Sequence, residues 1–117
     1  MMIEVREYLY EDGDSPFQDW FNRLDTAAAV KVTVYLTRMS KGNLSSIKGI
    51  GSGISECRID WGPGYRIYLG QDGPELIILL GGGTKKRQNQ DIKTAKSLWQ
   101  EYKRRKKEDK NADNTRF

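Results

Sequence analysis

Histidine is absent from the 117-residue sequence, and cysteine occurs once, at Cys57. A single cysteine cannot form a disulfide within the chain, which favours a reducing, cytoplasmic environment. Because there is no histidine and the carboxylates are dispersed, the sequence has no spacing typical of a zinc site. We therefore expect no structural disulfide, no metal and no other cofactor.

Long apolar runs are absent as well. No run approaches the ~20 residues that a membrane span requires, and residues 1–4 (Met-Met-Ile-Glu) lack the basic and apolar regions of a signal peptide. A chain of this length fits one domain with a modest core and no association with membranes. We expect the domain to cover residues 1–107 and the polar residues 108–117 to be disordered.

Positive charge is concentrated in the later part of the chain. Residues 1–40 contain four basic and seven acidic residues, whereas residues 41–117 contain sixteen basic and nine acidic residues. So uneven a distribution favours binding to a polyanion, most often nucleic acid. A soluble domain that ends in a basic tail explains the charge equally well, so charge alone does not decide between them.

The first elements follow from periodicity and capping residues. Residues 3–10 alternate as a strand does, which predicts that Leu9 faces the core and Tyr8 the other side. Ser15 and Pro16 suit the N-cap and first position of a helix. Asp25 can cap a second helix, and the two helices would form an αα-hairpin.

The rest of the chain is predicted to be mostly strand. Residues 43–53 read as a Gly/Ser-rich loop, followed by strands at 54–61 and 65–69 joined by a tight turn. Residues 75–80 are apolar on both sides, as in a central strand, and residues 81–83 (Gly-Gly-Gly) end that strand. A last helix begins near Gln90.

The predicted order is β-α-α-β-β-β-α. It corresponds to an α+β fold with an antiparallel-rich sheet, an N-terminal αα-hairpin on one face and a C-terminal helix. The other sheet face would be free to bind a ligand. A glycine-rich phosphate loop is not expected at residues 81–86, because the Walker spacing is missing. A backbone that passes close to another element explains these glycines better.

One face of the predicted hairpin is polar. A three-residue turn at 62–64 would pair Asp60 with Arg66 and Arg58 with Tyr68, and Glu56 would share their face. Ordinary cross-strand pairing, worth under ~1 kcal/mol when exposed, explains this pattern slightly better than an active site does. Residues 85–87 (Lys-Lys-Arg) change the balance, because their cations would meet the same sheet edge and suit phosphate.

These segments together resemble a known family. Glu-Cys-Arg-Ile-Asp at 56–60, Gly-Tyr-Arg-Ile-Tyr at 64–68 and Lys-Lys-Arg-Gln at 85–88 precede a helix with Asp91 and Ala95. This series resembles toxins of the RelE/ParE/HigB kind, from type II toxin–antitoxin systems, and most of all the phage-derived addiction-module killer proteins. The resemblance covers about residues 2–104 and implies a RelE-like fold.

The resemblance also implies an activity and a site. RelE-like relatives are mRNA interferases that cleave mRNA on the ribosome, whereas ParE-type relatives inhibit gyrase. Carried over by motif, Arg58, Arg66 and Lys86 are the implied catalytic residues of a metal-independent endoribonuclease. Lys85 is also implied by motif, as a residue that binds substrate. The polar face of the hairpin, the basic cluster and the 43–53 loop add Glu56, Tyr68, Arg87 and Lys48 as candidate substrate-binding residues. The implied partners are the ribosome, mRNA and a cognate antitoxin, commonly a helix-turn-helix DNA-binding protein.

Cleavage through the 2′-hydroxyl needs a base, a cation that stabilises the phosphorane, and an acid. The arginines and Lys86 can supply the charge, and the base could be Glu56 or a lysine with a lowered pKa. The product would carry a 2′,3′-cyclic phosphate or a 3′-phosphate. The open alternatives are a ParE-type gyrase inhibitor and a non-catalytic nucleic-acid-binding module.

Overall fold

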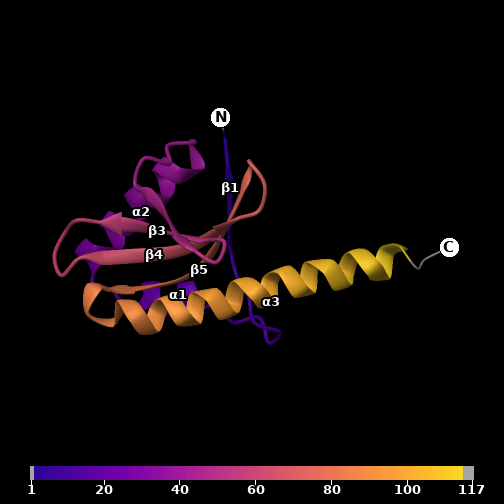
Figure 1. The fold of residues 1–117 in the computed structure, drawn as a ribbon. Helices are drawn as coiled ribbons and strands as arrows, with labels where there is room; N and C mark the ends of the chain where they lie inside the picture. Colours follow the sequence, from indigo (N-terminus) through magenta and orange to yellow (C-terminus); the bar gives the residue numbers. More distant parts are fainter. Residues whose placement is uncertain (1, 115–117) are drawn as a thin grey trace.

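Five strands form one mixed sheet in the order β1-β5-β4-β3-β2 (Figure 1). The structure is a computed structural model, and it describes the backbone of residues 2–114 and the side chains of residues 2–109. β1 pairs with β5 in parallel, and the other three pairings are antiparallel. The elements are β1 (Glu4–Glu7), α1 (Pro16–Asn22), α2 (Thr26–Ser40), β2 (Ile47–Gly51), β3 (Ile54–Ile59), β4 (Tyr65–Gln71), β5 (Leu76–Thr84), a 3-10 turn η1 (Lys85–Arg87) and α3 (Gln88–Asn114). The predicted α+β class is confirmed.

The predicted helix starts are also confirmed. The Ser15 hydroxyl accepts a hydrogen bond from the Gln18 backbone N–H at 3.0 Å, and the Asp25 carboxylate accepts one from Ala28 N–H at 2.8 Å. Both bonds satisfy N–H groups that a helix leaves without partners in its first turn. α1 and α2 therefore begin where the sequence predicts.

One strand was not predicted. Residues 47–51 form β2, which pairs with β3, although the sequence reads as a loop there. Glycines at 49 and 51 weaken the strand signal, because glycine has low strand propensity. Pairing with β3 holds this segment, and it places Lys48 opposite Glu56.

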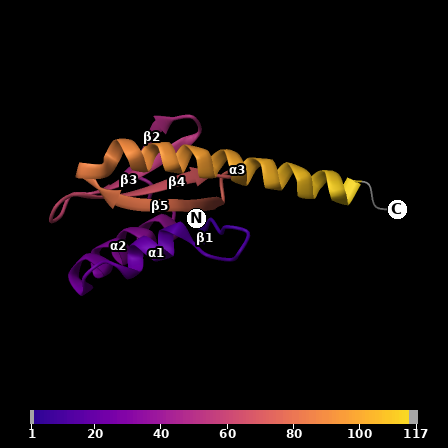
Figure 2. The same ribbon diagram turned by 90° about the horizontal axis from the view of Figure 1, so that it is seen from below.

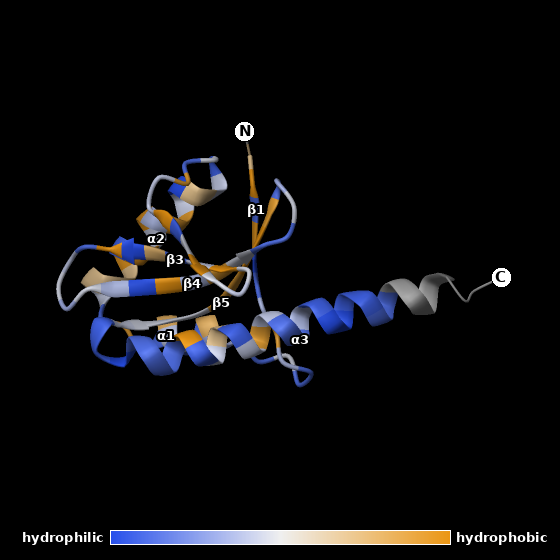
Figure 3. Cartoon of the chain, in the orientation of Figure 1, coloured by the Kyte–Doolittle hydropathy of each residue, from blue (hydrophilic) through white to orange (hydrophobic). Residues whose placement is uncertain are grey.

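The sheet is covered on both faces (Figure 2). α1 and α2 pack on one face over a core that includes Cys57, Ile59 and Ile67. α3 packs on the other face, which the sequence predicted to be free, through Ala95, Leu98, Trp99 and the strand residues they cover. The apolar part of α3 is limited to the stretch over the sheet (Figure 3). Tyr8 is consequently buried under α3, and Leu9, beyond the end of β1, is exposed, the reverse of the prediction.

β5 continues through the glycines that were predicted to end it. A bulge opposite Tyr68 and Leu69 shifts the register of β5, so the residues after it exchange faces. A Cβ atom on Gly82 would lie 2.3 Å from Trp20 of α1, and one on Gly83 would lie 2.0 Å from Asp91 of α3. The expected close approach of another element at these glycines is confirmed, and it comes from both sides of the sheet.

The β3–β4 hairpin has a different register from the one predicted. Ile59 pairs with Tyr65 and Arg58 with Arg66, so the connection spans residues 60–64 instead of 62–64. A shift of two residues leaves every side chain on its predicted face, because strand side chains alternate with a period of two. Asp60 leaves the ladder and lies in the turn.

α3 extends through residues 108–114, which were predicted to be disordered; residues 115–117 of that predicted tail lie outside the described part of the chain. No glycine or proline interrupts it, and Arg104 forms ion pairs with Glu101 and Glu108 one turn away on either side. Arg105 donates to the Leu9 carbonyl at 2.6 Å and to the Tyr8 hydroxyl at 2.7 Å. None of the helices in residues 2–114 is both long and apolar enough to cross a membrane.

Asp72 in the β4–β5 turn makes the second attachment of α3. Its carboxylate accepts hydrogen bonds from Lys106 Nζ at 2.6 Å and from the Tyr102 hydroxyl at 2.6 Å. The bond from Lys106, and next the one from Tyr102, lower the pKa of Asp72 from its usual value of 3.8. The attachment therefore requires the ionised carboxylate.

We expect Asp72→Asn to lower the free energy of unfolding by about 1–2 kcal/mol at neutral pH. Because the folded-state pKa of Asp72 is lowered, its contribution is full above the unfolded value of 3.8 and is lost as the pH falls through the folded value. Urea unfolding of both proteins at pH ~7 and pH ~3 measures this. A difference that is the same at both pH values contradicts the ionic attachment.

Candidate basic groove

The polar residues of the sheet face covered by α3 form two rows across the strands. One row runs from Lys48 through Glu56 and Tyr68 to Gly81. The next contains Arg58, Arg66 and Gly83. Two arginines directly opposite each other repel, so the second row needs a nearby anion.

Glu56 supplies that anion from beneath both arginines. Its side chain is 3% exposed, and its Oε1 lies 3.3 Å from Arg58 Nε while its Oε2 lies 3.2 Å from Arg66 Nε. The Arg66 side chain is 7% exposed, whereas that of Arg58 is 59% exposed. One carboxylate thus pairs with two guanidiniums, and the three groups together keep a net positive charge. Arg66 lies in the floor of the site and Arg58 at its surface.

A groove of about 390 Å³ opens beside these arginines. Its polar lining comes from the hairpin turn, from β3 and β4, and from the junction of η1 and α3. These residues are Arg58, Asp60, Tyr65, Arg66, Lys85 and Gln88. The Lys85 N–H donates to the Gly64 carbonyl at 3.1 Å, which ties the end of β5 to the turn.

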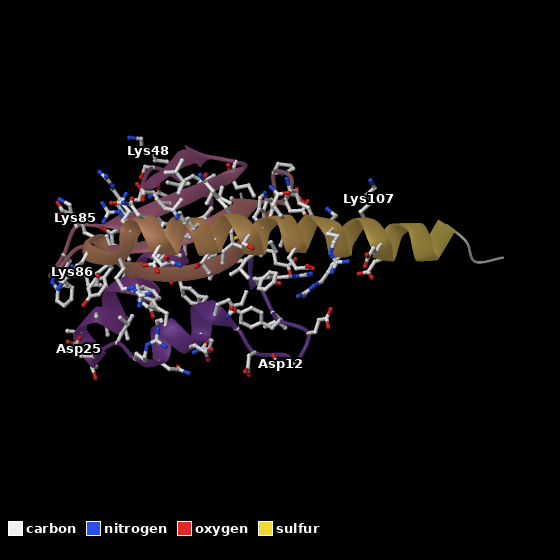
Figure 4. The ribbon with its side chains drawn as sticks, turned by 60° about the horizontal axis from the view of Figure 1, so that its bottom comes forward. Asp12, Asp25, Lys48, Lys85, Lys86 and Lys107 are labelled. Atoms are coloured by element: carbon white, nitrogen blue, oxygen red, sulfur yellow. The ribbon has the colours of Figure 1, made fainter. Side chains whose placement is uncertain are left out.

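Lys86 and Arg87 do not line this groove. They border a neighbouring hollow of about 450 Å³ together with Lys93, and Lys85 and Gln88 line both. Of the residues predicted as catalytic, the structure therefore brings Arg58 and Arg66 together, with Lys85 in the position expected for Lys86. Figure 4 shows Lys85 and Lys86 at the end of the sheet where α3 begins.

The other predicted substrate-binding residues lie elsewhere. Lys48 is exposed on the edge strand β2, away from Lys85 and Lys86 (Figure 4). Glu56 and Tyr68 are buried, with 2% and 1% of their surfaces exposed, so a bound substrate would not touch them directly. These two side chains are buried because α3 covers this face of the sheet.

A buried polar cluster lies next to the groove. The Tyr68 hydroxyl and Asp91 Oδ2 are buried without hydrogen-bond partners among the described residues, as are Glu56 Oε2 and Arg66 Nε despite their ion pair. Burial, and then the charges of Asp91 and Glu56, raise the pKa of Tyr68 to about 12. Burial also raises the pKa of Asp91, against the opposing effect of Arg87. Burial under α3 thus disfavours the charged forms of both side chains relative to water.

Sequence reasoning missed Gln88, Tyr65 and the position of Asp60 in the groove. The Glu-Cys-Arg-Ile-Asp segment marked Asp60 as a candidate, but its alternation predicts a strand that includes Asp60. The structure instead has a longer turn at residues 60–64, which places Asp60 in the groove. Within residues 2–109, no three acidic, cysteine or histidine side chains converge as metal ligands. The groove offers guanidinium, ammonium and amide donors, a set that binds phosphate oxygens well.

These features define a class of protein: a small α+β protein with helices on both faces of a mixed sheet and a basic groove at one end of it. No known family profile matches the sequence. A protein of Haemophilus influenzae, described as uncharacterized, is 44% identical over 86 residues, which cover 73% of this chain and 87% of that protein. The chain belongs to the same family as this Haemophilus influenzae protein.

Proposed function

We propose that this chain is a toxin of the RelE/ParE/HigB kind that acts in the cytoplasm and cleaves mRNA on the ribosome. The observation that carries the proposal is the convergence of Arg58, Arg66 and Lys85 on one groove, with Glu56 buried beneath the arginines. The motif series at residues 56–88 and the α+β fold with an antiparallel-rich sheet support the RelE-like assignment.

In this proposal the groove binds one phosphodiester of the mRNA. Arg58 and Lys85, both exposed, meet the phosphate oxygens, and Arg66 adds charge from the floor. Positive groups fixed in advance around a phosphorane lower its energy without reorganising during the reaction. Lys86 and Arg87, in the neighbouring hollow, would hold the next phosphate along the strand.

Asp60 is the group we assign to proton transfer. It is the one carboxylate among the described residues that line the groove, whereas Glu56 is buried and committed to two arginines. Its carboxylate accepts the 2′-hydroxyl proton as the 2′-oxygen attacks phosphorus. The bond between phosphorus and the 5′-oxygen breaks, water protonates the leaving 5′-oxygen, and the products are a 2′,3′-cyclic phosphate and a 5′-hydroxyl end. The ribosome would align the reacting atoms.

Inhibition of gyrase is the second candidate, and one observation favours it. The side chain of Arg66 is 7% exposed, which limits how closely a phosphate can approach it. A toxin that binds and blocks its target needs no such approach. In either case we expect a cognate antitoxin, commonly a helix-turn-helix DNA-binding protein, as the partner.

Inducing the chain in bacteria and mapping transcript ends tests the proposal. We expect breaks at codons soon after induction, and we expect Arg58→Ala, Lys85→Ala and Asp60→Asn each to reduce their rate by about 100-fold. Lys41→Ala is the matched control, because this lysine is exposed at the end of α2. DNA double-strand breaks with intact transcripts would support gyrase inhibition instead, and growth without either effect would contradict both toxin assignments.

A further inference from the structure

The basic segment at residues 103–107 is divided by its contacts. Arg104 pairs with Glu101 and Glu108, Arg105 binds Tyr8 and Leu9, and Lys106 binds Asp72. Lys103 and Lys107 are exposed, and neither forms an ion pair or side-chain hydrogen bond with residues 2–109, whose side chains the structure describes. Arg105 and Lys106 therefore attach α3 to the rest of the domain, whereas Lys103 and Lys107 are available to bind a ligand.

The free lysines of α3 lie on one flank of the helix. At 3.6 residues per turn, Lys93, Lys96, Lys103 and Lys107 fall within about 80° of one another around the helix axis. Among the side chains that the structure describes, only Asn89 and Gln100 share that sector, and it has no carboxylate. Glu101 and Glu108 lie on the other flank with Arg104. We call the four lysines the lysine flank.

The lysine flank continues the basic groove. Lys93 lines the neighbouring hollow, which shares Lys85 and Gln88 with the groove, so the flank begins beside the groove. From Lys93 to Lys107 the helix rises about 21 Å, long enough for several successive phosphates of a strand. Figure 4 shows Lys107 and Lys48 on the same side of α3, with Asp12 and Asp25 on the opposite side of the molecule.

A hollow of about 400 Å³ beside Lys103 and Lys107 contains aromatic side chains. Tyr102, which is half-buried, lines it with its ring stacked on that of the buried Trp99, 5.0 Å between centroids, and Lys106 neutralises Asp72 at its edge. Aromatic rings beside cations are typical of surfaces that bind single-stranded nucleic acid, where bases stack and lysines contact the backbone. This combination favours RNA over an acidic protein.

We infer that the lysine flank is a second RNA-binding surface, which holds the backbone of the strand several nucleotides away from the phosphate in the groove. The inference rests on the proposed function in one respect, that the groove binds RNA. Attachment of α3 through Arg105 and Lys106 keeps this surface at a fixed distance from Arg58 and Lys85. The groove then acts on the phosphate, and the flank adds affinity that depends on the length of the RNA.

Fluorescence anisotropy with unstructured labelled RNAs of about six and about 20 nucleotides tests the inference. The variant is Lys103→Gln/Lys107→Gln, and the control is Lys31→Gln/Lys41→Gln, which removes the same charge from exposed positions on or next to α2. We expect the flank variant to bind the longer RNA at least ~10-fold more weakly at 0.1 M salt, with a salt slope smaller by ~1.4. Binding of the shorter RNA, and the control with both RNAs, should match the unmodified chain.

Equal binding of the longer RNA by the flank variant and the unmodified chain would overturn the inference. Equal losses in the flank variant and the control would also overturn it, because the effect would then reflect net charge only. Failure of the proposed function has a different signature, which is the absence of codon-mapped breaks with the unmodified chain.

Discussion

Replacing Glu56 with glutamine is expected to lower the free energy of unfolding by about 3–5 kcal/mol. Glu56 lies 3.2 Å from Arg66, and both side chains are more than nine-tenths buried. The variant keeps the shape of the side chain but leaves the Arg66 guanidinium without its counter-ion under α3. A buried charge without a counter-ion loses its hydration, and no ion pair replaces it. The desolvation free energy of Arg66 therefore destabilises the folded state almost in full.

Arg58→Ala is the matched control, because Arg58 pairs with the same carboxylate at 3.3 Å but is 59% exposed. Exposed ion pairs contribute little, and we expect a loss of less than ~1 kcal/mol. Thermal unfolding followed by circular dichroism separates the two variants, since the Glu56→Gln loss corresponds to a melting temperature lower by about 10–20 °C. Similar melting temperatures for both variants would contradict the buried ion pair. They would show that water reaches Arg66, and a phosphate could then contact it directly.

The alternation of side chains along a strand explains how much of the site the sequence could predict. Alternation placed Glu56, Arg58, Arg66 and Tyr68 on one face, and that assignment is correct even though the predicted register was wrong by two residues. Register errors of two preserve the face, whereas an error of one would have exchanged the polar and apolar faces. The shared face of the two arginines was thus predictable, but Asp60 needed the true length of the turn.

The covering of that face by α3 was not predictable from pattern alone. The apolar residues of α3, which include Ala95, Leu98 and Trp99, indicate an amphipathic helix but not the sheet face on which it packs. Its position depends on contacts that are distant in sequence, such as Arg105 with Tyr8 and Lys106 with Asp72. A local feature explains why Lys85 lines the groove and Lys86 does not: the 3-10 turn η1 changes the direction of the chain just before α3.

Gly82→Ala is expected to destabilise the fold by about 3 kcal/mol. The added Cβ would lie 2.3–2.5 Å from three atoms of the Trp20 ring, which is closer than carbon atoms can approach. Trp20 is buried and packs against Phe17 and Tyr65, so the ring has no space into which to move. Either α1 shifts away from β5 or the end of β5 bends.

The control is Gly49→Ala on β2, where a Cβ would have no neighbour within 4 Å and the backbone needs no positive φ. We expect its effect on the free energy of unfolding to stay within ~0.5 kcal/mol. Trp20→Leu should be destabilising alone, because it leaves a cavity, yet it should suppress most of the Gly82→Ala loss in the double variant. Additive losses would contradict the direct clash. Because β5 leads into η1, the Gly82→Ala variant should also displace Lys85 and weaken the RNA binding that we propose for the groove, whereas Gly49→Ala should not.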